Sequence, residues 1–191
     1  MGIILDDKLK IEYQNLYDSC VINSSRAGIV GGLVNKIISN KARYEAAADR
    51  LKIPWQFVGV IHNMEASQNF NCHLHNGDPL SARTTHVPKG RPTEGNPPFA
   101  WEESAIDALT LRKVEIWQDW SIPGLLYQIE GYNGWGYKLN HPLVLSPYLW
   151  SFSNHYIKGK YVADGKWSDT TVSNQCGAAV LLKNLGVKDL V

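Results

Sequence analysis

The chain has 191 residues, of which 44% are hydrophobic and 19% charged, and its formal net charge is +1. This balance excludes an intrinsically disordered chain and predicts a single globular domain over residues 1–191. The near-neutral charge argues against a protein that tracks nucleic-acid phosphates, so we expect no nucleic-acid partner.

The cysteines and the N-terminus suggest a cellular compartment. Cys20, Cys72 and Cys176 are far apart, which fits free thiols better than a disulfide framework or a zinc ribbon. The N-terminus lacks a signal-peptide pattern, and no stretch approaches the ~20 apolar residues of a membrane helix. We therefore expect a soluble protein made in the cytoplasm, without membrane insertion, that needs another factor to reach a target beyond the membrane.

Taken in chain order, apolar residues at helical spacing predict a mainly α protein. Pro54 suits the first turn of one of these helices. The predicted helices cover 7–23, 26–50 (as one or two helices), 54–66, 100–118, 123–132 and 172–185.

Two segments lack helical periodicity. Residues 69–98 are rich in Gly and Pro, and a loop of that length inside a domain is usually functional. We expect a small β-hairpin there, including a strand at 82–87, that forms one wall of a cleft. Residues 140–170 are irregular and aromatic-rich. The chain has seven Trp and nine Tyr against four Phe, which fits a sugar-binding cleft as well as an ordinary core.

A single carboxylate ends the most apolar predicted helix. Glu65 follows Met64 and precedes Phe70, so we expect it to be partly desolvated, which favours its protonated form. A glycosidase needs such an acid to protonate the leaving oxygen. The alternative interpretation is a surface glutamate at a helix end.

Several segments of the chain resemble known cell-wall lytic enzymes. Residues 58–70 resemble the catalytic helix of the lysozyme superfamily, particularly goose-type lysozymes and soluble lytic transglycosylases, and Tyr132-Asn133-Gly134 resembles a turn that lines their cleft. Further segments resemble phage and prophage endolysin domains, and together the resemblance covers about residues 55–185. These segments are 73–80, 84–88, 101–109, 146–150 and 154–161.

The resemblance implies a lysozyme-like α+β fold with Glu65 as catalytic acid and bacterial peptidoglycan as substrate. The bond cleaved would be the β-1,4 bond between N-acetylmuramic acid and N-acetylglucosamine, without a metal or other cofactor. It also implies a monomeric endolysin released through a holin. The segment Glu65-Ala66-Ser67 departs from the usual Glu-Ser, which leaves hydrolysis, transglycosylation and a chitinase-type reaction open.

Asp78 is the first candidate for a second catalytic carboxylate. If it activates water on the opposite sugar face, the two carboxyl groups should stand ~6.5–9.5 Å apart. Within Asn76-Gly77-Asp78-Pro79 it could instead shape a turn. A lone acid acting with an ordered water or with the acetamido group of the substrate is the third interpretation.

The predicted substrate-binding residues come from the same segments. His62 lies one helical turn before Glu65 and could orient that acid. Lys158, Lys160 and Arg83 could meet carboxylates of the stem peptide, although such side chains are often only solvated. The remaining candidates for glycan contact are Thr84, Thr85, Tyr132, Asn133, Trp150 and His155.

Two other functions stay open. His73-x-His75 on a strand would place both imidazoles on one face, as in a zinc-dependent peptidoglycan amidase, although no His-Glu-x-x-His motif accompanies them. A Cys/His amidase using Cys72 is a weaker variant of this idea. The non-enzymatic alternative is a cell-wall binding module.

Overall fold

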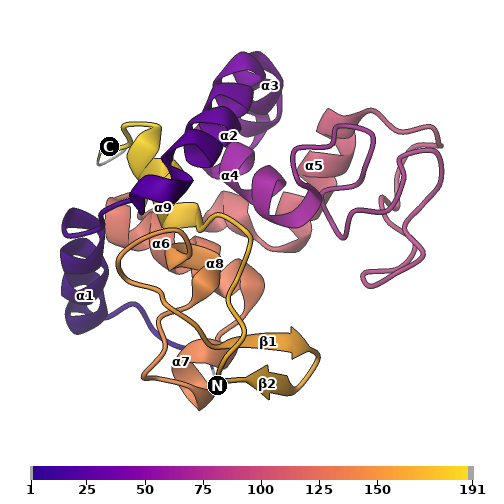
Figure 1. Cartoon of the computed structure of the whole chain (residues 1–191). Helices are drawn as coiled ribbons and strands as arrows, with labels where there is room; N and C mark the ends of the chain where they lie inside the picture. The colour runs from indigo at the N-terminus through magenta and orange to yellow at the C-terminus, as the bar shows by residue number, and fades with distance from the viewer. Residues whose placement is uncertain (1, 189–191) are drawn as a thin grey trace. The chain divides into compact units, whose positions relative to one another are not determined.

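The computed structural model describes residues 2–188 and is mainly helical, with one small antiparallel sheet (Figure 1). The predicted fold class is therefore confirmed at the level of a mainly α, α+β protein. The helices are α1 Asp7–Asp18, α2 Ala27–Ser39, α3 Lys41–Leu51, α4 Trp55–Ala66, α5 Trp101–Leu111, α6 Ile122–Asn133, α7 Gly136–Asn140, α8 Pro147–Trp150 and α9 Ala178–Asn184, with 3-10 turns η1 Ser24–Arg26 and η2 Val114–Ile116. The strands are β1 Lys160–Ala163 and β2 Lys166–Ser168.

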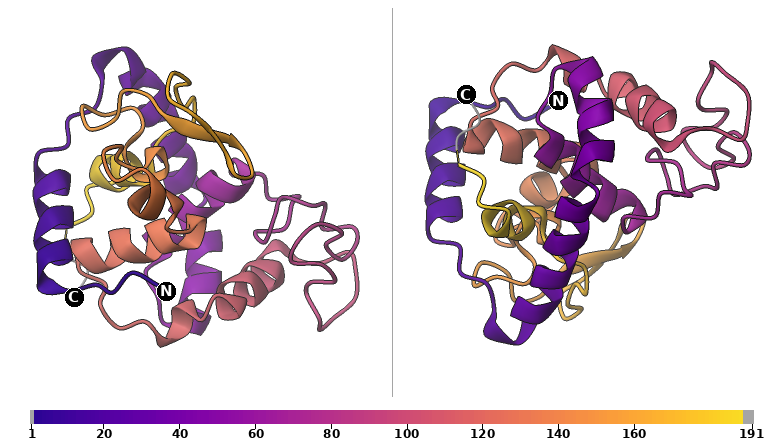
Figure 2. Two further views of the ribbon diagram at one scale, coloured as in Figure 1. Left: turned by 90° about the horizontal axis from the view of Figure 1, so that it is seen from below. Right: turned by 90° about the horizontal axis from the view of Figure 1, so that it is seen from above.

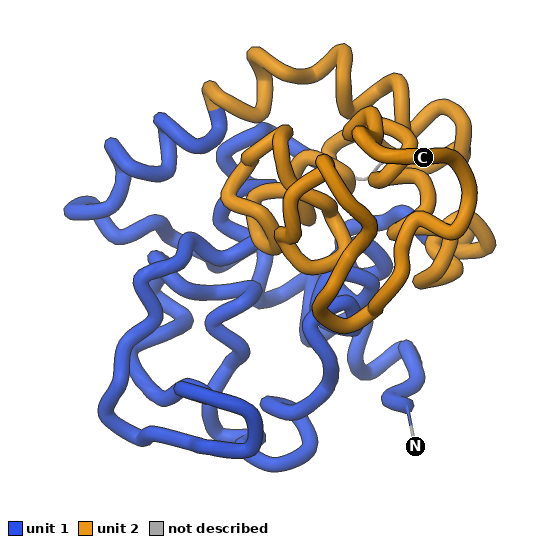
Figure 3. Tube along the Cα trace, turned by 90° about the vertical axis from the view of Figure 1, so that its right-hand side faces the viewer, with its two compact units in different colours: residues 1–34, 119–191 blue, residues 35–118 orange. Residues whose placement is uncertain are grey.

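The chain forms two compact units, which Figure 3 shows in different colours. Unit 1 comprises residues 1–34 and 119–191, and unit 2 comprises residues 35–118. The prediction of a single domain stays a prediction. None of the helices within residues 2–188 is long and apolar enough to cross a membrane.

Unit 1 is a helical core that carries the hairpin. α1 packs on α6, and α8 packs on both α6 and α9. Ser121 caps α6, and Pro123 occupies its first turn, where the missing N–H costs nothing. Within this core the buried carboxylate of Glu130 accepts a hydrogen bond of 2.5 Å from the hydroxyl of Tyr13. Burial raises the pKa of both groups.

Unit 2 consists of α3, α4, α5 and the long segment between α4 and α5. α3 packs on both α4 and α5. Gly59 permits close packing of α4, because a Cβ there would lie 2.9 Å from a methyl group of Ile37. Both views of Figure 2 show that the segment between α4 and α5 extends away from these helices as a long ordered loop. This segment carries most of the predicted site residues of unit 2.

The predicted location of the hairpin is wrong. Residues 69–98 contain no strand in the structure, only an isolated bridge between Cys72 and Pro79. The segment predicted as a strand, 82–87, is loop, and the prolines that follow it supply no backbone N–H for a ladder. The strands lie instead in the second irregular segment, where Lys160 pairs with Ser168 and Tyr161 with Trp167.

Gly32 offers a stability prediction within α2. Its position is exposed, and an added Cβ would meet no atom within 4 Å. Gly32→Ala should therefore raise the free energy of unfolding by about 1 kcal/mol, because alanine loses less backbone entropy in a helix. Urea denaturation measures this change. Gly59→Ala is the control and should destabilise the protein; a Gly32→Ala variant that also destabilises would contradict the prediction.

Candidate active site

Glu65 lies in the last turn of α4, the most deeply buried helix of unit 2. Every residue from Phe57 to Met64 is buried, whereas Glu65 itself is half-buried. The helix ends because Ser67 and Gln68 adopt left-handed backbone conformations, and Gln68 N–H donates to the carbonyl of His62. The C-terminal end of a helix carries partial negative charge. A carboxyl group in this turn lies near that partial negative charge.

The loop that follows α4 returns to contact the C-terminal end of this helix. Gly77 has φ +80°, and a Cβ there would lie 3.8 Å from the backbone carbonyl oxygen of Glu65. The Nζ of Lys36 donates to the carbonyl of Ser67 at 3.5 Å. The backbone around Glu65 is thus contacted by both the following loop and α2.

His62 belongs to a buried aromatic cluster. Its ring lies 4.6 Å from that of Phe70 and 4.5 Å from that of Trp101, and Nδ1 shares a 3.1 Å hydrogen bond with the hydroxyl of Tyr44. The side chain is fully buried. This burial argues against direct substrate contact by His62. Its ring contacts instead contribute to the packing that holds the last turns of α4 in place.

The burial of His62 predicts a pH dependence of stability. Burial lowers its pKa from the ordinary 6.5 to about 4. Between these pH values the unfolded chain binds more protons than the folded protein. The free energy of unfolding therefore falls as pH decreases through this window, and the whole loss due to His62 is reached below about pH 4. An NMR titration of the imidazole signals should show one histidine with a midpoint near 4. A midpoint near 6.5 for His62 would contradict the assignment.

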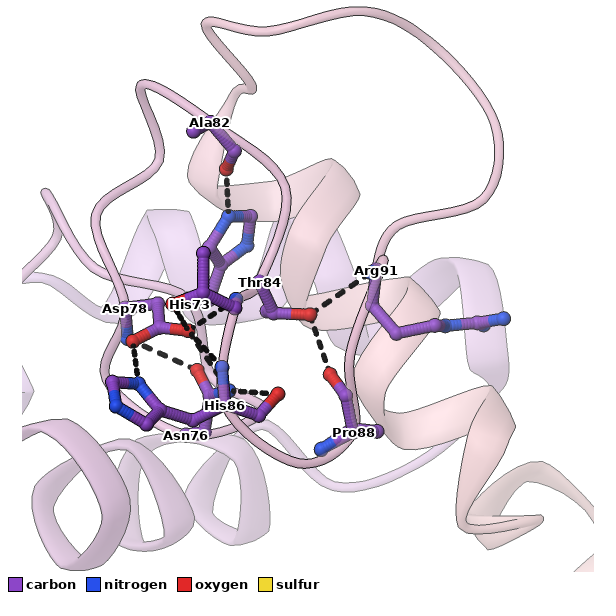
Figure 4. A network of polar contacts seen from close by, with 9 residues as sticks. His73, Asn76, Asp78, Ala82, Thr84, His86, Pro88 and Arg91 are labelled. Atoms are coloured by element: carbon purple, nitrogen blue, oxygen red, sulfur yellow. Dashed lines mark hydrogen bonds and ion pairs between the residues drawn. The ribbon is translucent and has the colours of Figure 1, made fainter.

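Asp78 organises the loop between α4 and α5 (Figure 4). Its Oδ2 accepts hydrogen bonds from the backbone N–H groups of Thr85 at 2.7 Å and His86 at 3.0 Å, and its Oδ1 lies 2.6 Å from Nδ1 of His86. Asn76 donates to Oδ2 as well. These hydrogen bonds hold the pKa of Asp78 well below its usual range. This geometry favours the turn-shaping interpretation of Asp78, and its catalytic role stays a prediction.

The two threonines of this loop serve the same structure. The Oγ1 of Thr84, which is almost fully buried, donates to the carbonyl of Pro88 at 2.5 Å and accepts from the N–H of Arg91 at 2.9 Å. Thr85 is exposed but bonds Asp78 through its backbone N–H and its hydroxyl. Thr84 therefore supports the loop, and only Thr85 retains the exposure that substrate contact needs.

His73 and His75 tie the loop to α5 through separate partners. Nδ1 of His73 lies 2.7 Å from the hydroxyl of Ser104, and Nε2 lies 2.8 Å from the carbonyl of Ala82. Nε2 of His75 lies 2.7 Å from a carboxylate oxygen of Asp107. Among residues 2–188 no group of three His, Cys, Asp or Glu side chains is placed to hold a metal ion. The arrangement thus lacks the ligand set that the zinc-amidase interpretation needs.

Two arginine–carboxylate ion pairs join separate segments of unit 2. Arg91 binds Asp107 through two nitrogens, at 2.5 and 2.9 Å. Arg43 binds Glu102 at 2.6 Å while its guanidinium covers the ring of Phe70 at 4.0 Å. Sequence reasoning missed both pairs, because their members are distant in the chain and no local motif connects them.

A cavity of about 560 Å³ opens beside Arg43 and the aromatic cluster. Its wall combines apolar rings with polar groups, including Phe70, Trp101, Asn71 and Ser81. Trp101 contributes little exposed surface because it is almost fully buried, and Arg43 covers the ring of Phe70. This cavity is a candidate ligand pocket of unit 2, and Glu65 is not among the residues that line it.

The four remaining candidates belong to unit 1 and differ in accessibility. Trp150 is buried within α8, and Tyr132 is almost completely buried at the end of α6. His155 is half-buried, and its Nε2 lies 2.8 Å from the carbonyl of Leu16. Asn133 is exposed and lines a cavity of about 440 Å³. Of these four, Asn133 is the residue best placed to contact a ligand.

Comparisons with protein-family models, with curated proteins and with solved structures find no match for this chain. Unit 2 contains three separate features: Glu65 at the end of a buried helix, a loop pinned by Asp78, and a cavity whose lining includes Phe70 but not Glu65.

Proposed function

We propose that the chain cleaves the glycan strands of bacterial peptidoglycan, with Glu65 as general acid. The observation that carries the proposal is the half-buried position of Glu65 in the last turn of α4. The packing of Tyr44, Phe70 and Trp101 around His62 fixes that turn, so the carboxyl group is held by a rigid support.

In the proposed reaction, Glu65 donates its proton to the glycosidic oxygen as the bond to the muramic acid C1 breaks. Positive charge develops on the sugar ring, and an oxygen nucleophile then forms a bond to C1. In hydrolysis this oxygen belongs to water, whose proton returns to Glu65. In transglycosylation the nucleophile is the 6-hydroxyl of the muramic acid itself, whose proton passes to Glu65 as the anhydro sugar forms.

Asp78 takes no chemical step in this proposal. Both of its oxygens already accept hydrogen bonds from Thr85 and His86, which lowers their basicity. A carboxylate held this way is a weak base for activating water. We therefore assign the second half of the reaction to an ordered water or to groups of the substrate.

Mass spectrometry of the fragments released from purified cell walls tests the proposal. New reducing-end sugars would support hydrolysis, and anhydro sugars would support transglycosylation by the same acid. New free amino groups, lost on treatment with a chelator, would instead support a zinc amidase. Binding to the walls with no released fragment would support a non-enzymatic binding module and contradict the proposal.

A further inference from the structure

A cavity beside the β1–β2 hairpin of unit 1 takes no part in the proposed reaction. It has a volume of about 440 Å³ and is lined by Asn133 from α6, Tyr137 from α7 and Tyr148 from α8. The hairpin contributes Lys160 and the turn that contains Asp164. Residues from α6, α7, α8, the hairpin and the segment 173–175 thus converge on one concave surface, as ligand sites do.

The wall formed by the hairpin is rigidly held. The ring of Trp167 stacks on that of His141 with centroids 3.5 Å apart and an angle of 9°. The N–H of Tyr161 donates to the hydroxyl of Tyr137 at 3.3 Å. Gly159, at φ +98°, lets the chain pass the Trp167 ring, because a Cβ there would lie 3.0 Å from it. A preformed wall loses little entropy when a ligand binds.

The charges of this cavity indicate the chemistry of its ligand. Lys160 and Asp164 both line it and carry opposite charges, yet neither forms an ion pair with any residue among 2–188. Asn133 and Gln175 add amide groups that can both donate and accept. A ligand that carries one carboxylate and one ammonium group would satisfy both charges, whereas a neutral sugar would satisfy neither.

We propose that this cavity binds the zwitterionic end of a diamino acid in the stem peptide of peptidoglycan. Lys160 receives the carboxylate and Asp164 receives the ammonium of the same carbon, while Tyr137 and Tyr148 contact the aliphatic part. This inference rests on the proposed function, since it names the peptide portion of the same substrate. It assigns substrate selection to unit 1, through charges that the glycan strand itself lacks.

Calorimetric titration of the full chain with short peptides tests the inference without involving cleavage. The probe is L-Ala-γ-D-Glu-meso-diaminopimelate, compared with the same peptide amidated at the distal carboxyl group and with neutral chitotetraose. Lys160→Gln and Asp164→Asn should each weaken binding of the probe about tenfold, the loss expected for one charge-assisted contact. The amidated peptide should bind the unaltered protein about tenfold more weakly than the probe and lose no further affinity in Lys160→Gln.

Lys166→Gln is the matched control, because Lys166 is an exposed residue of the same hairpin that does not line the cavity. Affinity unchanged in this variant supports the inference. An equal loss in Lys166→Gln, equal binding of both peptides or no binding of the probe would overturn it.

The outcome is separable from that of the proposed function. Peptide binding without release of glycan fragments would defeat only the proposed function, and fragment release without peptide discrimination would defeat only this inference.

Discussion

Glu65→Gln should lower the rate of peptidoglycan cleavage by about 100- to 10,000-fold, the usual contribution of a general acid. Glutamine keeps the size of the side chain but has no proton to give to the leaving oxygen. Because Glu65 is half-buried at a helix end, the replacement should leave the fold intact. The rate of reducing-end or anhydro-sugar release from purified walls measures the effect.

Glu94→Gln is the matched control, since Glu94 is an exposed glutamate of unit 2. Its cleavage rate should stay within about twofold of that of the unaltered protein, as for a surface change away from the chemistry. Glu65→Gln should still bind cell walls, because only the proton donor is lost. A Glu65→Gln variant that cleaves walls at the original rate would remove Glu65 from the mechanism.

Asp78→Asn should destabilise the protein by about 2–3 kcal/mol, the size of a lost hydrogen bond to a charged group in a buried site. Asparagine has one carbonyl oxygen in place of two charged carboxylate oxygens, so it cannot accept both from the backbone N–H groups of Thr85 and His86 and from Nδ1 of His86. Urea denaturation measures the loss, and hydrogen exchange should rise in residues 76–92. Asp49→Asn, at an exposed position of α3, is the control and should change stability by less than about 0.5 kcal/mol.

The stability that Asp78 contributes has a defined pH dependence. Its folded-state pKa lies well below the ordinary 3.8, so the contribution is present above pH 3.8 and is lost as pH falls toward the folded-state pKa. Asp78→Asn should therefore lose part of the acid sensitivity of the parent protein. An unchanged stability, or unchanged acid sensitivity, would show that the hydrogen bonds of Asp78 contribute little.

The same variant separates the two interpretations of Asp78. If Asp78 only organises the loop, folded Asp78→Asn protein at low temperature should keep a substantial fraction of its cleavage rate. If Asp78 activates water, the rate should fall as far as in Glu65→Gln. The hydrogen bonds to Thr85 and His86 favour the first outcome.

The sequence predicted part of the helical structure, because apolar spacing records which face of a helix is buried. The predicted helices 7–23 and 100–118 end earlier, at Asp18 and Leu111, and α7 and α8 were not predicted. α4 and α6 lie close to their predicted ranges. The predicted helical region 26–50 is two helices, with Asn40 between α2 and α3. The final helix spans only Ala178–Asn184, shorter than the predicted 172–185.

The hairpin could not be located from the sequence, because both irregular segments contain turn signals and β-branched residues. Strand formation was decided by tertiary contacts, namely the packing of Tyr161 and Trp167 on Tyr137. In the loop 69–98, side-chain hydrogen bonds from Asp78 and Thr84 replace the backbone ladder that was predicted.

The candidate site was predictable only in part, because residue type does not reveal exposure. Asn133 and Thr85 are exposed, as substrate contact requires, whereas Trp150, Thr84 and His62 are buried. Aromatic and small polar residues serve equally well in a cleft and in a core. The pairs Arg43–Glu102 and Arg91–Asp107 depended on the fold, since each joins different segments of the chain.

The most direct test of the central claim compares the products that the unaltered protein and Glu65→Gln release from the same purified walls. Equal amounts of wall-bound protein should be used, so that binding and cleavage are measured separately. We predict new glycan ends, with reducing or anhydro sugars, from the unaltered protein and almost none from Glu65→Gln. Release of the same glycan ends by both proteins, or of free amino groups without any glycan ends, would contradict the assignment of Glu65 as the acid that cleaves the glycan.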